Sequence, residues 1–145
     1  MRLTYAAAGW FVLCAGVVTT PAALAACTLD VESLPFGAFL AEDGGESTTK
    51  VVARCDAPVA LEVRPVDGDG ERRMSGSGGD LRYDLFIDRS HTVRFGDGSG
   101  SSQALVGVSD GEKPNEWRLY GKVFRDQSVS AGIFSDSVVL ELRID

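Results

Sequence analysis

The sequence predicts an all-β domain, a β-sandwich of about seven short strands. Apolar and polar residues alternate in several segments, which is the period of a strand with one buried face. The 17 glycines gather in short runs that are typical of turns. No window keeps the 3.6-residue apolar period of an amphipathic helix. Short strands separated by such turns are typical of a sandwich of two antiparallel sheets.

The amino-terminal segment has the layout of a cleavable export signal. Arg2 is its only charge, residues 6–18 form an apolar run of 13 residues, and Ala23-Leu24-Ala25 offers the small side chains that a signal peptidase requires. A membrane-spanning helix needs about 20 apolar residues, so this run is too short for an anchor. We therefore expect residues 1–25 to be removed on export and residues 26–145 to form one mature domain without a membrane span.

Two cysteines remain after the signal, because Cys14 leaves with it. An even number of cysteines in an oxidising compartment can pair, and Cys27 and Cys55 are 28 positions apart. In the chain-entropy model, a bridge of that length contributes about 3–4 kcal/mol. The residues Leu24-Ala25-Ala26-Cys27 also fit a bacterial lipobox, in which the Cys27 sulfur would carry a lipid. We expect the disulfide, and a lipid-anchored periplasmic binding module is the alternative.

The first half of the mature chain carries three expected strands. Residues 28–33 alternate loosely, and Pro35-Phe36-Gly37 interrupts them. After an acidic, Gly-containing turn, residues 47–55 are rich in Thr and Val, which favour strands. Residues 59–64 place an apolar side chain at every second position, which indicates a strand with one apolar face.

The second half begins with a Gly- and Asp-rich stretch, which we expect to be a long connection over residues 67–80. A strand with apolar residues at every second position follows at 81–88, and a flexible turn is expected at 96–102. A later strand covers 117–123. The last strand, over 134–144, is the most regular, and its apolar face comprises Phe134, Val138, Leu140, Leu142 and Ile144.

Composition and motifs argue against an enzyme, a metalloprotein and a nucleic-acid binder. The chain has 21 acidic and 14 basic residues, whereas nucleic acids and anionic bilayers attract basic patches. His91 is the only histidine, no nucleophile motif accompanies it, and the residues for a zinc site are lacking. Residues 67–71 fit a calcium loop poorly, because Gly78 stands where the loop needs its last glutamate. We expect no catalytic residues, no cofactor and no metal.

A set of short motifs runs in order through the mature chain. They are Cys27-Thr28-Leu29, Leu34-Pro35-Phe36-Gly37, Val52-Ala53-Arg54-Cys55, Arg73-Met74, residues 81–88, residues 95–98, residues 120–123, Gln127 and residues 131–136. In order and spacing this set resembles the spore coat protein U family of secreted pilin-like domains, over about residues 26–145. Phe95 and Phe134 stand where the family often has Trp and Tyr, and both keep an aromatic ring. The motif positions to which the resemblance gives structural roles are Phe36, Gly37, Tyr83, Gly96, Tyr120, Gly121, Gln127, Gly132 and Asp136.

The resemblance implies a function that the strand pattern alone does not. Members of this family are subunits of archaic chaperone–usher pili or related surface coat proteins. Their fold is an incomplete immunoglobulin-like sandwich that lacks its final strand and so exposes a hydrophobic groove. A periplasmic chaperone fills the groove first, and the amino-terminal extension of a neighbouring subunit fills it later, by β-strand addition. The implied partners are the chaperone, an outer-membrane usher and neighbouring subunits, and the implied location is the periplasm and then the cell surface.

Two expectations concern strand exchange. The sequence ends just after its most regular apolar strand, so we expect the edge of that strand to need a partner. Cleavage after Ala25 leaves at most Ala26 ahead of Cys27, so we expect no donor extension and a terminal position, at a tip or cap. A coat protein that is deposited on a surface without forming fibres is the alternative. The expected wall of the acceptor groove is Phe134, Val138, Leu140, Leu142 and Ile144.

Overall fold

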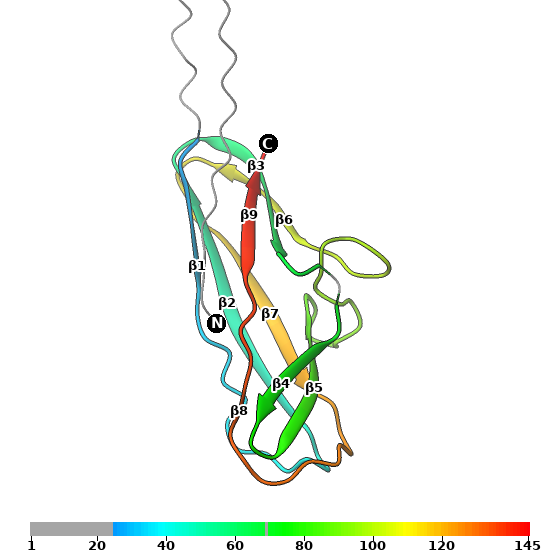
Figure 1. Cartoon of the computed structure of the whole chain (residues 1–145). Helices are drawn as coiled ribbons and strands as arrows, with labels where there is room; N and C mark the ends of the chain where they lie inside the picture. The colour runs from blue at the N-terminus through cyan, green and yellow to red at the C-terminus, as the bar shows by residue number, and fades with distance from the viewer. Residues whose placement is uncertain (1–24, 69) are drawn as a thin grey trace, which may run out of the picture.

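The structure is a computed structural model that describes residues 25–68 and 70–145, and these residues form strands and connections without a helix (Figure 1). The predicted export signal lies outside the described residues, apart from Ala25. The described strands are β1 (Cys27–Val31), β2 (Gly45–Cys55), β3 (Pro58–Pro65), β4 (Arg72–Gly76), β5 (Gly79–Phe86), β6 (Leu105–Asp110), β7 (Asn115–Val123), β8 (Phe134–Ser135) and β9 (Leu140–Ile144). The all-β fold is confirmed, with nine described strands in place of about seven.

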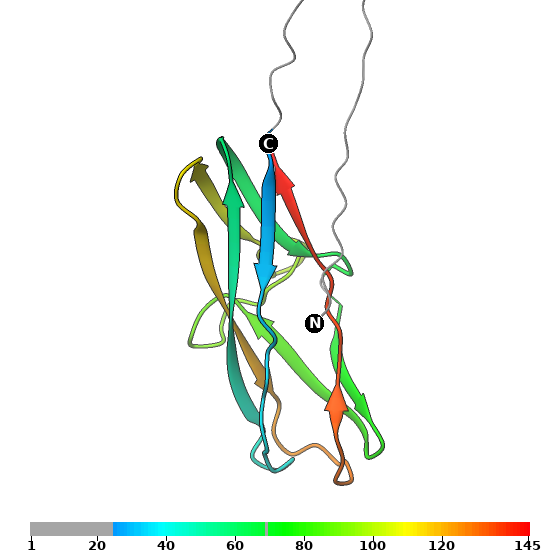
Figure 2. The ribbon, with the colours of Figure 1, turned by 90° about the vertical axis from the view of Figure 1, so that its left-hand side faces the viewer.

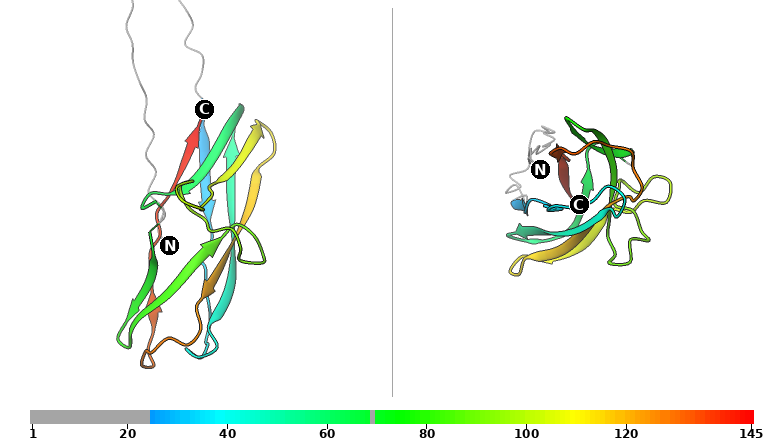
Figure 3. Two further views of the ribbon diagram at one scale, coloured as in Figure 1. Left: turned by 90° about the vertical axis from the view of Figure 1, so that its right-hand side faces the viewer. Right: turned by 90° about the horizontal axis from the view of Figure 1, so that it is seen from below.

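The strands form two antiparallel sheets. Six strands make one sheet in the order β1-β2-β7-β5-β4-β8, and three make the other in the order β6-β3-β9. The three-stranded sheet lies toward the end of the molecule that carries the carboxyl terminus, and β4, β5 and β8 lie toward the opposite end (Figures 1 and 3). The larger sheet is therefore covered by the smaller one over only part of its length.

The core lies between the two sheets and follows the strand period. In β2, the inward residues Thr49, Val51 and Ala53 are buried while their neighbours are more exposed. Val63 on β3 and Leu119 on β7 meet Val51 in one buried cluster, and Ala53 belongs to a second cluster with Cys27 and Leu61. Each such aliphatic side chain stabilises the fold by about 1.5–3 kcal/mol when fully buried. This shared apolar layer is what holds the two sheets together.

The expected disulfide is confirmed. Cys27 and Cys55 are bonded through their sulfurs, and they are also cross-strand partners in the β1–β2 ladder. The bridge therefore ties the first residue of β1 to the last residue of β2. In this state the Cys27 sulfur carries no lipid.

Two strands lie where the sequence pattern did not indicate them. β4 falls inside residues 67–80, so the expectation of a long connection there is wrong. Its inward residues are Met74 and the charged Arg72, which breaks the apolar period. β6 was not predicted either, because its inward positions include Gly107 and Ser109 while two valines face outward. In β5, Asp84 and Phe86 are buried together with the expected apolar face.

The last predicted strand, residues 134–144, is not one strand. β8 pairs with β4 in the larger sheet, β9 pairs with β3 in the smaller sheet, and residues 136–139 cross between them. Apolar residues stand at every second position of this segment except at Asp136, and a single polar residue in the pattern does not by itself reveal a change of sheet. Figure 2 shows β8 and β9 in succession, with β9 beside β1 near the carboxyl terminus.

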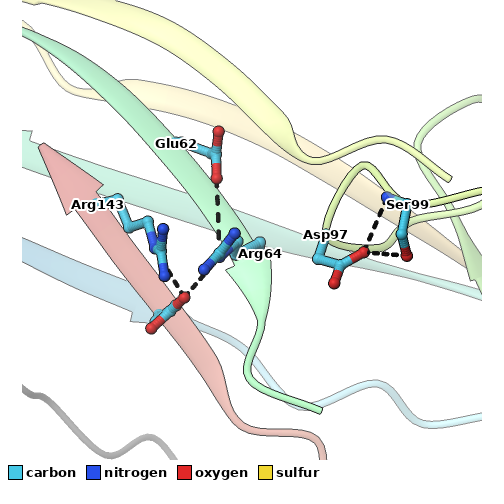
Figure 4. A network of polar contacts seen from close by, with 6 residues as sticks. Glu62, Arg64, Asp97, Ser99 and Arg143 are labelled. Atoms are coloured by element: carbon cyan, nitrogen blue, oxygen red, sulfur yellow. Dashed lines mark hydrogen bonds and ion pairs between the residues drawn. The ribbon is translucent and has the colours of Figure 1, made fainter. Parts of the chain in front are cut away.

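Charged side chains on the outer face of the smaller sheet join β9 to β3 (Figure 4). Glu141 Oε1 lies 2.6 Å from Arg64 Nε and 2.9 Å from Arg143 Nε, and Glu62 lies 3.8 Å from Arg64. In the nearby loop shown in the same figure, Asp97 accepts hydrogen bonds from Ser99. Partly exposed ion pairs of this kind contribute about 0–1 kcal/mol each. They help to hold β9 at the edge of its sheet.

Candidate functional site

An open groove of about 740 Å³ lies over the part of the larger sheet that the smaller sheet leaves uncovered. None of its lining residues belongs to β3, β6 or β9. Its floor consists of inward residues of β4 and β5, namely Met74, Leu81, Tyr83 and Leu85. Its two banks are residues 34–41, which follow β1, and residues 129–136 with Val138, which include β8. The lining is mostly apolar.

The first bank, residues 34–41, is fixed to the larger sheet by close packing. An added Cβ at Gly121 of β7 would lie 2.8 Å from Phe36 and 2.7 Å from Leu34, so a glycine is needed for their approach. The Ser47 hydroxyl of β2 donates a hydrogen bond to the carbonyl of Pro35. Gly37 has a φ of 68°, a conformation that glycine adopts without strain. This non-strand segment is thus held against β2 and β7 of the larger sheet.

The second bank, residues 129–136, rests on the β4–β5 turn. The Ser130 amide donates to the Gly78 carbonyl at 3.0 Å, and an added Cβ at Gly78 would lie 2.0 Å from the Ser130 carbonyl oxygen. Gln127 holds the start of this segment, because its side chain donates to the carbonyls of Arg82 and Phe124 and accepts from the Arg82 amide. Both banks are therefore fixed to the larger sheet, the first by side-chain packing on Gly121 and the second by hydrogen bonds to its backbone.

Large apolar side chains stand exposed at the mouth of the groove. Leu40 on the first bank is 60% exposed, and Ile133 on the second bank is 90% exposed. Leaving such side chains in water forgoes the stabilisation that their burial would bring. An apolar groove with exposed apolar side chains at its rim is typical of a surface that binds a protein partner.

Tyr83 is the main polar feature of the floor. Its hydroxyl donates to Asp136 Oδ2 at 2.5 Å, and its ring lies edge-on to Phe36 with centroids 6.0 Å apart. The side chain thus connects the two banks across the groove. Burial and then the hydrogen bond to Asp136 raise the pKa of Tyr83 well above its ordinary value, so the hydroxyl remains a donor at neutral pH.

Two strand edges lie side by side next to the groove. Two hydrogen bonds show which backbone groups of β9 face β3. The Asp145 amide donates to the Ala60 carbonyl, and the Val66 amide donates to the Val139 carbonyl. Because backbone directions alternate along a strand, the backbone groups of Leu140, Leu142 and Ile144 point away from β3. In the same way the Glu32–Lys50 hydrogen bond shows that Leu29 and Val31 of β1 point away from β2.

The β1 and β9 edges share an apolar cluster. The side chains of Leu29 on β1 and Leu142 on β9 both pack against the buried group formed by Cys27, Ala53 and Leu61. Figure 2 shows the two strands next to each other, running in opposite directions. The unpaired backbone groups of the two sheets are therefore close together, and the groove continues from this place along the molecule.

The structure brings two of the five predicted wall residues into the groove, Phe134 and Val138. Leu140, Leu142 and Ile144 lie on β9, outside the lining. Sequence reasoning did not assign the first bank or the floor formed by β4 and β5 to the groove. The signal for the first bank was the concentration of apolar residues in a segment without strand period: Leu34, Phe36, Phe39 and Leu40.

The family-motif positions fall into three places. Phe36, Gly37, Tyr83, Gly132 and Asp136 line the groove, while Gly121 and Gln127 support its banks. Gly96 and Tyr120 lie elsewhere. The Gly96 amide donates to the Gln103 carbonyl, and the Tyr120 ring lies edge-on to His91.

Within residues 25–68 and 70–145, no three side chains of the metal-binding types are grouped so as to hold a metal ion. None of these residues forms a helix with the length and apolarity needed to cross a membrane.

Comparisons with known proteins place this geometry in a family. The model of the Spore Coat Protein U domain family matches residues 14–141. No curated protein matches the sequence. Among solved structures, the crystal structure of the CsuC–CsuE chaperone–tip adhesion subunit pre-assembly complex, from archaic chaperone–usher Csu pili of Acinetobacter baumannii, contains a similar chain with a TM-score of 0.53 and 14% identity. The match covers 84% of this chain but 40% of that one, so this chain spans less than half of that chain's length. At this identity the likeness shows a shared fold.

Proposed function

The chain belongs to the Spore Coat Protein U domain family, and on that premise we propose that it is a structural subunit of a chaperone–usher surface fibre that accepts a β-strand from a partner. The observation that carries the proposal is the apolar groove beside the adjacent free edges of β1 and β9. A strand placed there would find backbone partners on the sheet edges and apolar contacts along the groove. Surface deposition without fibres is the alternative from the sequence.

β-Strand addition suits both the edges and the floor. Each backbone hydrogen bond formed along an edge contributes about 0.5–1.5 kcal/mol net. On the floor, Leu81, Tyr83 and Leu85 are alternate residues of β5 and so lie about 7 Å apart along the strand. An inserted strand has the same spacing between side chains on one face, so every second side chain would enter the groove. The proposed occupant is therefore a strand with alternating apolar residues.

The proposed partners are a periplasmic chaperone, an outer-membrane usher and neighbouring subunits. Support comes from the family and from the shared fold with a chain of a chaperone–tip adhesion subunit complex. The chaperone would fill the groove in the periplasm, and a neighbouring subunit would replace it at the cell surface. A protein that exposes an unpaired apolar groove is prone to aggregation, which is the physical reason for a chaperone.

We also propose a terminal position in the fibre, at a tip or cap. If export removes residues 1–25, Ala26 alone precedes the disulfide residue Cys27. In the uncleaved chain the Ala26 nitrogen donates to Asp56 Oδ1 at 2.8 Å, and cleavage after Ala25 would turn this nitrogen into the terminal ammonium group beside the same carboxylate. The mature protein should add to one end only of fibres formed by a polymerising subunit, as seen by electron microscopy of labelled protein. Self-polymerisation, or addition at both ends, would disprove the terminal position.

The groove is tested by a matched pair of substitutions in the mature protein. Ile133→Asp places a charge at the groove mouth, and Val108→Asp places one at a similarly exposed site, 73% exposed on the outer face of β6. Exposed substitutions of this kind change stability by about 0.5 kcal/mol or less. We expect the amount of protein that co-purifies with the candidate chaperone to fall at least about tenfold for Ile133→Asp and to stay unchanged for Val108→Asp. The reason is that a partner strand would bury an unpaired charge at position 133 but not at position 108. Equal binding by both variants would contradict the groove as the docking site.

A further inference from the structure

The smaller sheet has a second edge, β6, which has the features of an aggregation-prone strand. Val106 is 67% exposed and Val108 is 73% exposed. The backbone carbonyl of Ala60 on β3 accepts a hydrogen bond from β9. Because backbone directions alternate along a strand, the backbone groups of Leu61 and Val63 point toward β6, where these residues pair with Gly107 and Leu105. The backbone groups of Val106 and Val108 therefore point away from the sheet. An exposed apolar edge strand is a template for adding another strand unless its outward backbone groups are blocked.

Two side chains from the other sheet occupy these outward carbonyls. Trp117 Nε1 donates to the Val106 carbonyl at 3.2 Å, and Asn115 Nδ2 donates to the Val108 carbonyl at 3.1 Å. Both residues belong to β7 and lie two positions apart, as do the carbonyls that they bind. Their spacing thus matches the repeat of β6. A strand that added to β6 would need the same two carbonyls as its acceptors.

Gly107 makes this contact sterically possible. An added Cβ at Gly107 would lie 3.0 Å from both Asn115 Nδ2 and Trp117 Cζ2. The indole ring lies against the β6 backbone at a residue without a side chain, and it packs at the same time against both buried apolar clusters. The ring is consequently held in place by the core. Its removal from β6 would disturb the packing between the sheets.

We propose that Trp117 and Asn115 close the β6 edge to strand addition, so that a partner strand can join the smaller sheet only at β9. No side chain of the described residues donates to the outward carbonyls of Leu140 or Leu142 on β9 in this way. Trp117 and Asn115 thus determine which edge of the smaller sheet can pair with an added strand. This inference concerns the fold and does not depend on the role in a fibre.

The test opens the β6 edge in the mature chain, residues 26–145. Asn115→Ala combined with Trp117→Phe removes both donors and keeps an aromatic ring between the sheets. We expect this variant to self-associate in sedimentation velocity. As it associates, hydrogen exchange at the amides of Val106 and Val108 should slow at least about tenfold, whereas in the unaltered protein these amides should exchange rapidly at all concentrations. Adding Val106→Lys should abolish the association, because an edge lysine opposes strand pairing.

Glu116→Ala is the matched control, because this residue lies between the two on β7 and faces the other side of the sheet. It should leave the β6 amides unprotected at every concentration. If the double variant does not fold, Asn115→Ala alone replaces it, because Asn115 is only half-buried at the start of β7. This single variant should protect the β6 amides in the same direction but to a smaller extent. The proposal is overturned if folded variants show no concentration-dependent protection of β6, or if the protection appears on β9.

Discussion

β6 and β9 are the two edges of one three-stranded sheet, and they differ in what covers them. The outward carbonyls of β6 are occupied by Asn115 and Trp117, while the outward groups of β9 face the free edge of β1. Both edges expose apolar residues, so apolarity does not distinguish them. The two edges differ in whether their outward backbone groups are hydrogen-bonded. An edge that is open to strand addition thus has unpaired backbone groups beside an apolar groove. A closed edge has side-chain donors whose spacing matches that of its outward carbonyls.

The largest effect on this comparison should come from removing the disulfide. Cys27→Ser with Cys55→Ser frees β1, the strand that borders the open β9 edge. We expect the free energy of unfolding to fall by about 2–5 kcal/mol in urea denaturation. The amides of β1 should exchange faster while those of β6 remain as before.

The control for the disulfide variant is the unaltered protein with reductant, which should show the same loss. A loss below about 1 kcal/mol in both would mean that β1 is held by its ladder with β2, not by the bridge.

An intermediate effect is expected at Tyr83, which connects the two banks of the groove. Tyr83→Phe removes the hydrogen bond to Asp136 and should lower the free energy of unfolding by about 1–2 kcal/mol. Tyr120→Phe is the control, because no hydrogen bond of its hydroxyl is described in residues 25–68 and 70–145. Because the first bank keeps its packing on Gly121 and the second keeps its hydrogen bond to Gly78, binding of a partner strand should weaken and not vanish.

The raised pKa of Tyr83 also predicts a pH dependence. In the unfolded chain the hydroxyl loses its proton near its ordinary pKa of 10.0, whereas in the folded protein it stays protonated to higher pH. Its contribution to stability is therefore fully present below pH 10 and is lost as the pH rises further. Urea denaturation between pH 8 and pH 11 should show this fall, and Tyr83→Phe should remove part of it. An identical alkaline fall in both proteins would refute the assignment.

The smallest effect is expected for the ion pairs that join β9 to β3. Glu141→Gln weakens the contacts with Arg64 and Arg143 and should cost about 0.2–1 kcal/mol, decreasing with added salt. Glu116→Gln breaks the Lys50–Glu116 pair of the larger sheet and serves as the control. If Glu141→Gln changed stability by several kcal/mol, β9 would depend on this network to remain in its sheet.

The sequence predicted the strands whose buried and exposed faces follow side-chain polarity. β3 and β7 bury the apolar residues of their alternating pattern, and β2 is rich in the strand-forming residues Thr and Val, so all three were found. β4 turns a charged Arg72 inward, and β6 turns valines outward, so neither has the expected period. Their place is set by tertiary partners, which the local sequence does not name.

The groove was predicted from family resemblance and only partly by its residues. Phe134 and Val138 line it, but the regular pattern of residues 134–144 hides the crossing from one sheet to the other. The first bank, residues 34–41, has no period at all, because it packs through Phe36 on Gly121 and not through a ladder. Which strand fills the groove, and the terminal position, remain proposals.

Hydrogen exchange of the mature protein, free and bound to its candidate chaperone, tests the central claim most directly. We predict that binding protects the outward amides of Leu142 and Ile144 on β9 and of Leu29 and Val31 on β1. The amides of Val106 and Val108 on β6 should exchange equally fast in both states. Protection of β6, or binding that leaves the β1 and β9 amides unchanged, would contradict the account.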